Sequence, residues 1–393
     1  MGNPLPATQA RIRRRSLLAV AVVVGAGLTG CGPTQAPSLS QSPATVSPSP
    51  ATTPTKSGIA SPVAGYLDPT RWEGRVVTVA SQGGRYQAAQ EDAFFQPFAA
   101  ATGALMRQEA VDVSELRRQV EAERVTWDLA DFPADQALAL AREGLLTPID
   151  YQVVDRSLLA PELVLQHSVG VAFFSTVMGY LGGGTRPESW DDFWNPAIIA
   201  GLRALRRSPV GNLEFALLAD GVELTELYPL DVDRAFQKLD EIKPFIAQWY
   251  DNALQPVELL LNGNVTLAST FNVQAESEEV SGDVRIQWQG GMLSAQCWVI
   301  PRGAPNADLA MDLINFATRA VPVANFSQLL PFGPVNREAL TLIRPDRLAV
   351  LPTAPEHRSK QFIQNWNWWL DNEQALVERF ERWLLAEDAA TPT

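Results

Sequence analysis

Short apolar runs alternate with segments of helical periodicity from about residue 72 onward. Residues 76–80 form a largely β-branched run that predicts a buried strand, and residues 127–130 predict a second one. Two later segments place apolar side chains at i, i+4 and i+7, which is typical of helices that pack on a sheet. These positions are Leu309, Leu313 and Phe316, and Leu376, Phe380 and Trp383. The alternation predicts an α/β fold.

The N-terminus carries a different pattern, a basic cluster followed by the apolar run 17–28. This run is too short to span a bilayer core, which needs roughly 20 helical residues, and is typical of an export signal. It ends in Leu-Thr-Gly-Cys31, which resembles the lipobox of bacterial lipoproteins. The resemblance implies a signal peptide over 1–30 and a lipid on Cys31; a secretory peptide that contains a cysteine by chance is the alternative. Arg14 and Arg15 also resemble a twin-arginine motif, so two export routes stay open.

Residues 31–70 are dominated by Pro, Ser, Thr and Ala. Such a segment cannot bury enough apolar surface to offset the entropy lost on ordering. Pro-rich chains of this kind behave as extended spacers. We therefore predict a tether between Cys31 and the folded part of the chain, and a short tail at 388–393.

The composition of the whole chain predicts a core large enough for two lobes of ordinary size. The chain is 46% hydrophobic and holds 11 Trp and 16 Phe. Cys297 is the only cysteine besides Cys31, so no disulfide is expected inside the exported part. The net charge of −13 disfavours nucleic acid as a partner. An acidic field favours cationic solutes, although solubility alone explains an acidic surface equally well.

The sequence lacks the motifs of the common catalytic and metal sites. Its two histidines, His167 and His357, are far apart and show no HExxH or other metal-ligand spacing. There is no GxSxG elbow, P-loop or GxGxxG fingerprint, and the glycines at 182–184 favour a loop. Carboxylates are abundant, but nothing selects a catalytic pair. We therefore predict no catalytic residue, no metal and no cofactor.

Six groups of residues occur in the order found in one protein family. They are Ser-Gln-Gly-Gly-Arg-Tyr at 81–86 with Pro-Phe at 97–98 and Thr-Gly at 102–103; Trp-Asp-Leu at 127–129 with Arg-Glu-Gly-Leu at 142–145; Ser-Trp-Asp-Asp-Phe-Trp at 189–194; Asn-Gly-Asn-Val at 262–265 leading to Val-Ile-Pro-Arg-Gly-Ala at 299–304; Gly-Pro-Val-Asn at 333–336; and Glu-Arg-Phe-Glu-Arg-Trp-Leu at 378–384. Over residues 72–385 the chain resembles solute-binding proteins of ABC importers, related to the spermidine/putrescine binders.

The resemblance implies a two-lobed, type II periplasmic-binding-protein-like α/β fold, in which each lobe is a mixed sheet flanked by helices. A small organic solute would bind in the cleft, and the lobes would close over it by a hinge motion. Matching the segments places lobe 1 at 71–178 plus 289–342 and lobe 2 at 179–288 plus 343–387. The resemblance also implies ABC-transporter permease subunits as partners, and we expect the protein to be a monomer.

In family polyamine binders, cleft carboxylates hold ammonium groups and aromatic rings enclose the alkyl chain. Carried over position by position, the aromatic and polar part of this site falls on Phe271, Asn272, Ser294, Gln296, Phe332, Trp366 and Asn367. The position at which family polyamine binders carry a carboxylate is occupied here by Gln296, so the acidic part of the site is less complete than the aromatic part. The acidic candidates are Asp135 and Glu214, the latter one position out of register. Core packing of the two phenylalanines and a helix-capping role for Asp135 are the alternatives.

The turn at 81–84 lies between a predicted strand and a predicted helix. Free backbone N–H groups and the helix dipole favour an anion there, and Gly83 and Gly84 allow close approach of the backbone. Together with Gln82, Arg85 and Tyr86, this turn is a candidate anchor for a carboxylate. A ligand with an amine and an acid group would use both anchors. Polyamine-like and zwitterionic, amino-acid-like solutes are therefore both predicted.

These observations predict an exported solute-binding lipoprotein that is anchored to the outer face of the cell membrane through Cys31. It would capture a small organic solute and deliver it to an ABC transporter. A ligand sensor or scaffold of the same fold with no transport role is the alternative, because the acidic residues of the family site are partly missing. A tethered enzyme is a third class, disfavoured by the two isolated histidines.

Overall fold

The computed structural model describes residues 66–277, 280 and 282–386, all within one compact unit, 56–393. The predicted signal peptide, the lipid attachment at Cys31, most of the tether and the C-terminal tail lie outside these residues. Within the described ranges, no helix combines the length and the apolar character needed to cross a membrane.

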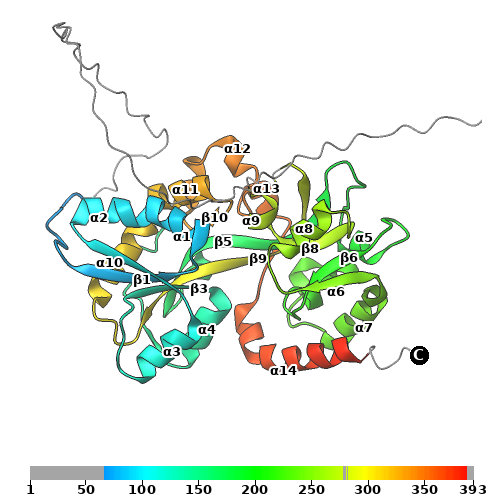
Figure 1. Ribbon diagram of the computed structural model, residues 1–393, viewed down its shortest axis with the longest axis horizontal. Helices are drawn as coiled ribbons and strands as arrows, with labels where there is room; N and C mark the ends of the chain where they lie inside the picture. Colours follow the sequence, from blue (N-terminus) through cyan, green and yellow to red (C-terminus); the bar gives the residue numbers. More distant parts are fainter. Residues whose placement is uncertain (1–65, 278–279, 281, 387–393) are drawn as a thin grey trace, which may run out of the picture. The chain divides into compact units, whose positions relative to one another are not determined.

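A sheet of mixed parallel and antiparallel strands forms the centre of the described part (Figure 1). The strand order is β2-β1-β3-β9-β5-β8-β6-β7, with β10 beside β5 and with β4 and β11 beside β9. The strands are β1 Val76–Ser81, β2 Leu105–Ala110, β3 Leu129–Pro133, β4 Leu146–Thr147, β5 Ser168–Leu181, β6 Arg203–Arg206, β7 Ile246–Tyr250, β8 Leu267–Phe271, β9 Val284–Pro301, β10 Gly333–Pro334 and β11 Phe362–Ile363.

The long strands β5 and β9 join the two ends of this sheet. They pair antiparallel with each other along most of their length. The C-terminal part of β5 also pairs with β8, whereas the C-terminal part of β9 pairs with β3. The register shifts between Gly170 and Ala172, and again between Thr176 and Met178. Side chains that these two strands present to a site are therefore held on a well-paired backbone.

Helices cover the sheet, and side-chain caps fix where several of them begin. Asp112, Asp231 and Asn365 accept hydrogen bonds from backbone N–H groups in the first turns of α3, α7 and α14. The α-helices are α1 Gly84–Gln90, α2 Gln96–Thr102, α3 Val113–Glu121, α4 Ala134–Arg142, α5 Trp190–Trp194, α6 Asn212–Ala219, α7 Val232–Ile242, α8 Gln255–Leu261, α9 Asn272–Ala275, α10 Ala307–Ala317, α11 Ala320–Leu329, α12 Pro345–Leu348, α13 Pro355–Arg358 and α14 Trp366–Leu385. A π-helix, η1 Glu91–Phe95, joins α1 to α2, and the 3₁₀ helices are η2 Pro161–Leu163, η3 Leu224–Glu226, η4 Lys243–Phe245 and η5 Arg337–Thr341.

The structure confirms the strand predicted at 76–80, which is β1, and both helical stripes, which lie on α10 and α14. The second predicted strand begins later, at Leu129. Asp128, the residue just before this strand, fixes the start of the strand by hydrogen bonds. Its carboxylate accepts hydrogen bonds from the N–H groups of Thr78 and Asn306 at 2.8 and 2.7 Å.

Buried apolar side chains fall into three clusters. The largest draws mainly on residues from Tyr66 to Phe173 and from Leu293 to Leu351. The second begins at Met178 and is rich in aromatic rings, and a smaller third one surrounds Tyr250. The change of cluster thus occurs within β5. The lobe limits given above stay a prediction.

Candidate functional site

Two adjoining cavities lie beside β5 and β9. The smaller, of about 300 Å³, is lined by side chains from β5, β6, β8, β9 and the first turns of α4 and α14, and we call it the polar chamber. The larger, of about 500 Å³, is lined by α1, α8, α9 and the segment after α11, and we call it the apolar chamber. Four residues line both, so the two chambers adjoin each other. They are Gln82, Val273, Gln274 and Phe332.

Asp135 and Arg206 are the charged side chains among the described residues that line the polar chamber. Asp135 lies in the first turn of α4, where its carboxylate accepts the N–H of Gln136 at 2.9 Å. Burial raises the pKa of Asp135, and its backbone hydrogen bonds and the charge of Arg206 oppose the rise only in part. Arg206 ends β6, and its guanidinium lies 5.6 Å from the ring centre of Phe271. The chamber therefore offers one negative and one positive charge.

Aromatic rings enclose the same space. Phe174, Phe271, Phe332 and Trp366 all line the polar chamber. Phe174 packs edge-to-face against Phe271 at 5.7 Å and against Phe332 at 6.4 Å, measured between ring centres. Aromatic faces attract alkyl groups and cations alike, so this wall suits an aliphatic ligand that carries an ammonium group.

A network of hydrogen bonds connects the amide side chains of the chamber to the buried carboxyl of Asp131. Tyr86 Oη and Gln90 Nε2 donate to Asp131 Oδ2 at 2.7 and 2.6 Å. The Gln296 amide, in the orientation that satisfies its neighbours, donates to Asp131 Oδ1 at 3.2 Å. In the same orientation it accepts from Gln82 Nε2 at 2.8 Å. Burial raises the pKa of Asp131 to about 7, so this network titrates near neutral pH.

We predict that Asp131 makes the stability of the protein fall as the pH rises through about 7. A carboxyl whose folded-state pKa is raised favours folding below its unfolded pKa and loses that contribution above its folded one. Asp131→Asn removes this titration and keeps an acceptor for Tyr86. The Tm difference, variant minus wild type, should therefore rise by a few degrees between about pH 4 and pH 7 and level off above pH 7. A difference that stays constant over this range would contradict the assignment.

Among the residues that the structure describes, two buried amide atoms beside the chambers have no hydrogen-bond partner. They are the acceptor Gln274 Oε1 and the donor Gln364 Nε2. The oxygen of Gln364 accepts from Ser294 Oγ at 2.7 Å. Leaving a buried polar atom unpaired costs roughly 1–3 kcal/mol. A ligand that donates to one of these atoms and accepts from the other would recover that free energy.

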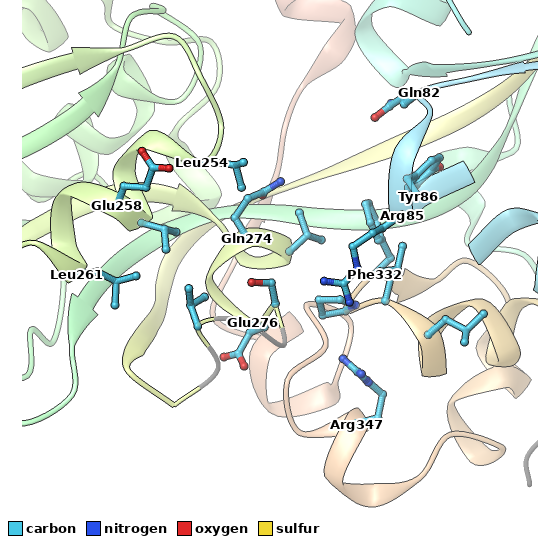
Figure 2. Close-up of a pocket in the computed structure, with 17 residues that line it drawn as sticks. Gln82, Arg85, Tyr86, Leu254, Glu258, Leu261, Gln274, Glu276, Phe332 and Arg347 are labelled. Carbon is cyan, nitrogen blue, oxygen red and sulfur yellow. The ribbon is translucent and has the colours of Figure 1, made fainter. Parts of the chain in front are cut away.

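Figure 2 shows the apolar chamber between the side chains of α8 and α9 on one side and those of α1, Phe332 and α12 on the other. Arg85 and Tyr86, which we predicted as part of a carboxylate anchor, line this chamber and not the polar one. The ring of Tyr86 packs against Phe326 and Phe332, and its hydroxyl is engaged by Asp131. Tyr86 therefore supports the wall between the chamber and the core.

The structure brings half of the predicted site together in the polar chamber. The predicted residues that line it are Gln82, Asp135, Phe271, Ser294, Gln296, Phe332 and Trp366. Gly83, Gly84 and Asn367 line neither chamber. The two glycines have φ of 77° and 56° and turn the chain from β1 into α1, whereas Asn367 is exposed on α14.

Glu214, a predicted ligand contact, is a core residue that lines neither chamber. Its fully buried carboxylate accepts hydrogen bonds from Tyr228 Oη at 2.5 Å, Trp369 Nε1 at 2.7 Å and the N–H of Gly211 at 2.9 Å. Burial raises its pKa, and these donors oppose the rise. The one-position difference in register was the signal that this carboxylate serves the start of α6.

Asn272 is also buried, and it positions the aromatic wall without lining either chamber. Its Oδ1 accepts the N–H of Ser175 at 2.7 Å, and its Nδ2 donates to the carbonyl of Pro331 at 2.8 Å. These bonds tie β5 to the segment that carries Phe332. Both ends of the Asn272 amide are thus used inside the protein.

Sequence reasoning missed Arg206, Phe174 and Gln364. Phe174 and Thr176 are two positions apart on β5, so their side chains lie on the same face of the strand. This spacing could have identified Phe174 from the sequence. Arg206 follows the short apolar pair at 204–205, and no pattern in the sequence shows that this strand ends beside α4. Gln364 lies between the two-residue strand β11 and α14. This segment has no periodic pattern that would indicate which way its side chains face.

Residues 93–358 match the family model for bacterial extracellular solute-binding proteins. The chain belongs to this family. Among its curated relatives, the gamma-aminobutyric acid-binding protein of Pseudomonas aeruginosa is 32% identical over 318 residues, which cover 78% of this chain and 90% of the relative. The spermidine/putrescine-binding periplasmic protein of Escherichia coli is 24% identical over 221 residues, which cover 53% of this chain and 63% of the relative.

Solved structures agree with this assignment. An ABC transporter substrate-binding protein from Bradyrhizobium japonicum matches with a TM-score of 0.75 at 33% identity, over 79% of this chain and 99% of that one. A GABA receptor matches with a TM-score of 0.72 at 33% identity, over 79% of this chain and 98% of that one. The predicted family and the type II fold class are confirmed. This solute-binding protein is exported and supplies a small organic solute to an ABC transporter.

Proposed function

We propose that this solute-binding protein captures a small zwitterion, an amino acid whose ammonium and carboxylate groups are separated by a short alkyl chain. The observation that carries the proposal is the charge pattern of the polar chamber, with one acid and one base among uncharged lining residues. Asp135 holds the ammonium group and Arg206 holds the carboxylate, each by charge-assisted hydrogen bonds. The aromatic wall encloses the alkyl chain between them.

A polyamine fits this chamber less well. Two ammonium groups need two carboxylates, and Asp135 is the acidic side chain among the described residues that line the chamber. Arg206 would repel the second cation, whereas a zwitterion satisfies both charges at once. The charge pattern therefore narrows our prediction from the sequence, which left both solute classes open.

The relatives support the same choice. The relative and the solved structure that are named for gamma-aminobutyric acid are 32% and 33% identical to this chain. The relative named for spermidine and putrescine is 24% identical over a shorter stretch. Gamma-aminobutyric acid carries an ammonium and a carboxylate at the two ends of a three-carbon chain, so it belongs to the proposed class.

The proposal includes a lipid anchor at Cys31, a tether over 31–70 and no catalytic role. The basic cluster, the apolar run and the Leu-Thr-Gly-Cys31 sequence support the anchor. An extended tether would let the folded part, acting as a monomer, reach the permease while Cys31 stays in the outer leaflet.

Thermal melting of the purified protein against a panel of solutes tests this function. A ligand present at 100 times its dissociation constant adds roughly 2.7 kcal/mol of stability and raises the Tm by a few degrees. We expect amino acids with separated charges to raise the Tm, and diamines, monocarboxylates and sugars to leave it unchanged. A shift produced by diamines alone would contradict the proposal.

A further inference from the structure

Exposed leucines gather around the apolar chamber. Leu254, Leu261 and Leu329 expose 57%, 41% and 41% of their surface, and all three line this chamber. Figure 2 shows Leu254 and Leu261 on the side opposite Tyr86 and Phe332, so apolar groups face the cavity from two walls. Charged side chains complete the lining, and they are Arg85, Glu258, Glu276 and Arg347. Apolar side chains that are exposed inside a concave site are typical of a surface that binds an apolar group.

The apolar chamber adjoins the polar chamber, and four residues line both. Gln274 lies at this junction, and its Oε1 is buried without a hydrogen-bond partner. The polar chamber alone, at about 300 Å³, is at the small end of ligand sites. The apolar chamber adds about 500 Å³ beside it. The space therefore exceeds what a short, unsubstituted amino acid fills.

We propose that the solute of this protein carries an alkyl or aryl substituent that occupies the apolar chamber while its charged groups bind Asp135 and Arg206. The inference rests on the proposed function and names the substrate class within it, amino acids with an apolar side group. The substituent leaves water for a cavity walled by Leu254, Leu261 and Leu329, which adds affinity in proportion to the apolar area buried. The junction at Gln274 accepts a hydrogen bond from the ligand between the two chambers.

Calorimetric titration of the purified protein with gamma-aminobutyric acid and three derivatives tests this proposal. The derivatives carry a phenyl ring at carbon 2, 3 or 4, so that each direction out of the polar chamber is sampled. We expect at least one derivative to bind about tenfold more tightly than the parent, since a buried ring removes a large apolar area from water. A derivative that binds where the parent does not would support the proposal as well.

Two other outcomes would overturn this proposal, and only one of them would also contradict the proposed function. If the parent binds and no derivative binds more tightly, the apolar chamber takes no substituent, and the proposed function stands. If neither the parent nor any derivative binds, the proposed function fails together with this inference.

A double variant tests whether the substituent binds in the apolar chamber. Leu254→Gln with Leu261→Gln removes apolar surface from one wall at positions exposed enough to leave the fold intact. The affinity advantage of the best derivative over the parent should fall at least fivefold in this variant. The matched control is Leu105→Gln with Leu202→Gln, at leucines that expose 54% and 45% and line neither chamber, and it should keep the advantage. An advantage that persists in the first variant would overturn the assignment to this chamber.

Discussion

Replacing Arg206 with glutamate is expected to reverse the ligand preference of this protein from gamma-aminobutyric acid to putrescine. The substitution turns the single positive charge of the polar chamber into a second negative one, opposite Asp135. A carboxylate ligand then meets repulsion where it met a charge-assisted hydrogen bond, whereas a diamine finds an acid for each end. Affinity for gamma-aminobutyric acid should fall at least 100-fold and affinity for putrescine should rise about tenfold, as measured by calorimetry.

Arg207→Glu is the matched control for this reversal. Arg207 is the next residue along the chain, is exposed, and pairs with Glu381 at 2.6 Å outside the chamber. Exposed ion pairs contribute at most about 1 kcal/mol to stability, so this variant should fold and bind as the wild type does. Retention of full affinity for gamma-aminobutyric acid in Arg206→Glu would show that Arg206 does not hold the carboxylate.

Asp135→Asn is expected to lower the affinity for the zwitterion roughly 100-fold, because it leaves the ammonium group without a counter-charge in a partly desolvated site. The wild type should also lose affinity in acid, since protonated Asp135 cannot pair with an ammonium group. Burial raises the pKa of Asp135, so this loss begins at a higher pH than for an ordinary carboxyl. Titrations from neutral pH downward should show a larger loss of affinity in the wild type than in the variant.

Glu143→Gln controls for the loss of one acid near the same helix. Glu143 is exposed at the end of α4 and pairs with Arg117 at 2.7 Å, away from both chambers. Its substitution should leave the affinity and its pH profile unchanged. A wild-type profile that stays flat in acid would contradict the contact between Asp135 and the ammonium group.

Much of the fold could be predicted from the sequence because its elements repeat their apolar positions regularly. The run at 76–80 and the stripes on α10 and α14 bury the side chains that periodicity marks. The pairing of β5 with β9 is different. It joins segments more than a hundred positions apart, and no local pattern indicates that contact. The resemblance to a family placed a lobe limit in each of these two segments, at 178 and at 288, but did not predict that they pair.

Some residues of the candidate site could be predicted from the sequence, and others could not. Ser294, Gln296 and Phe332 were found because ordered motifs carry them, and the structure places all three in the polar chamber. Glu214, one position out of register with the family site, lies in the core at the start of α6. Arg206 was missed because nothing in the sequence marks where β6 ends. Which of two neighbouring polar residues faces the ligand depends on packing at the end of β6 and the start of α6, which no periodicity encodes.

We propose that this protein recognises its ligand by one negative and one positive charge. Calorimetric titration with three four-carbon ligands tests it most directly: gamma-aminobutyric acid carries both charged ends, putrescine carries two amines and butyrate carries one acid. We expect gamma-aminobutyric acid to bind at least tenfold more tightly than either of the others. Putrescine binding as tightly as gamma-aminobutyric acid, or more tightly, would contradict it.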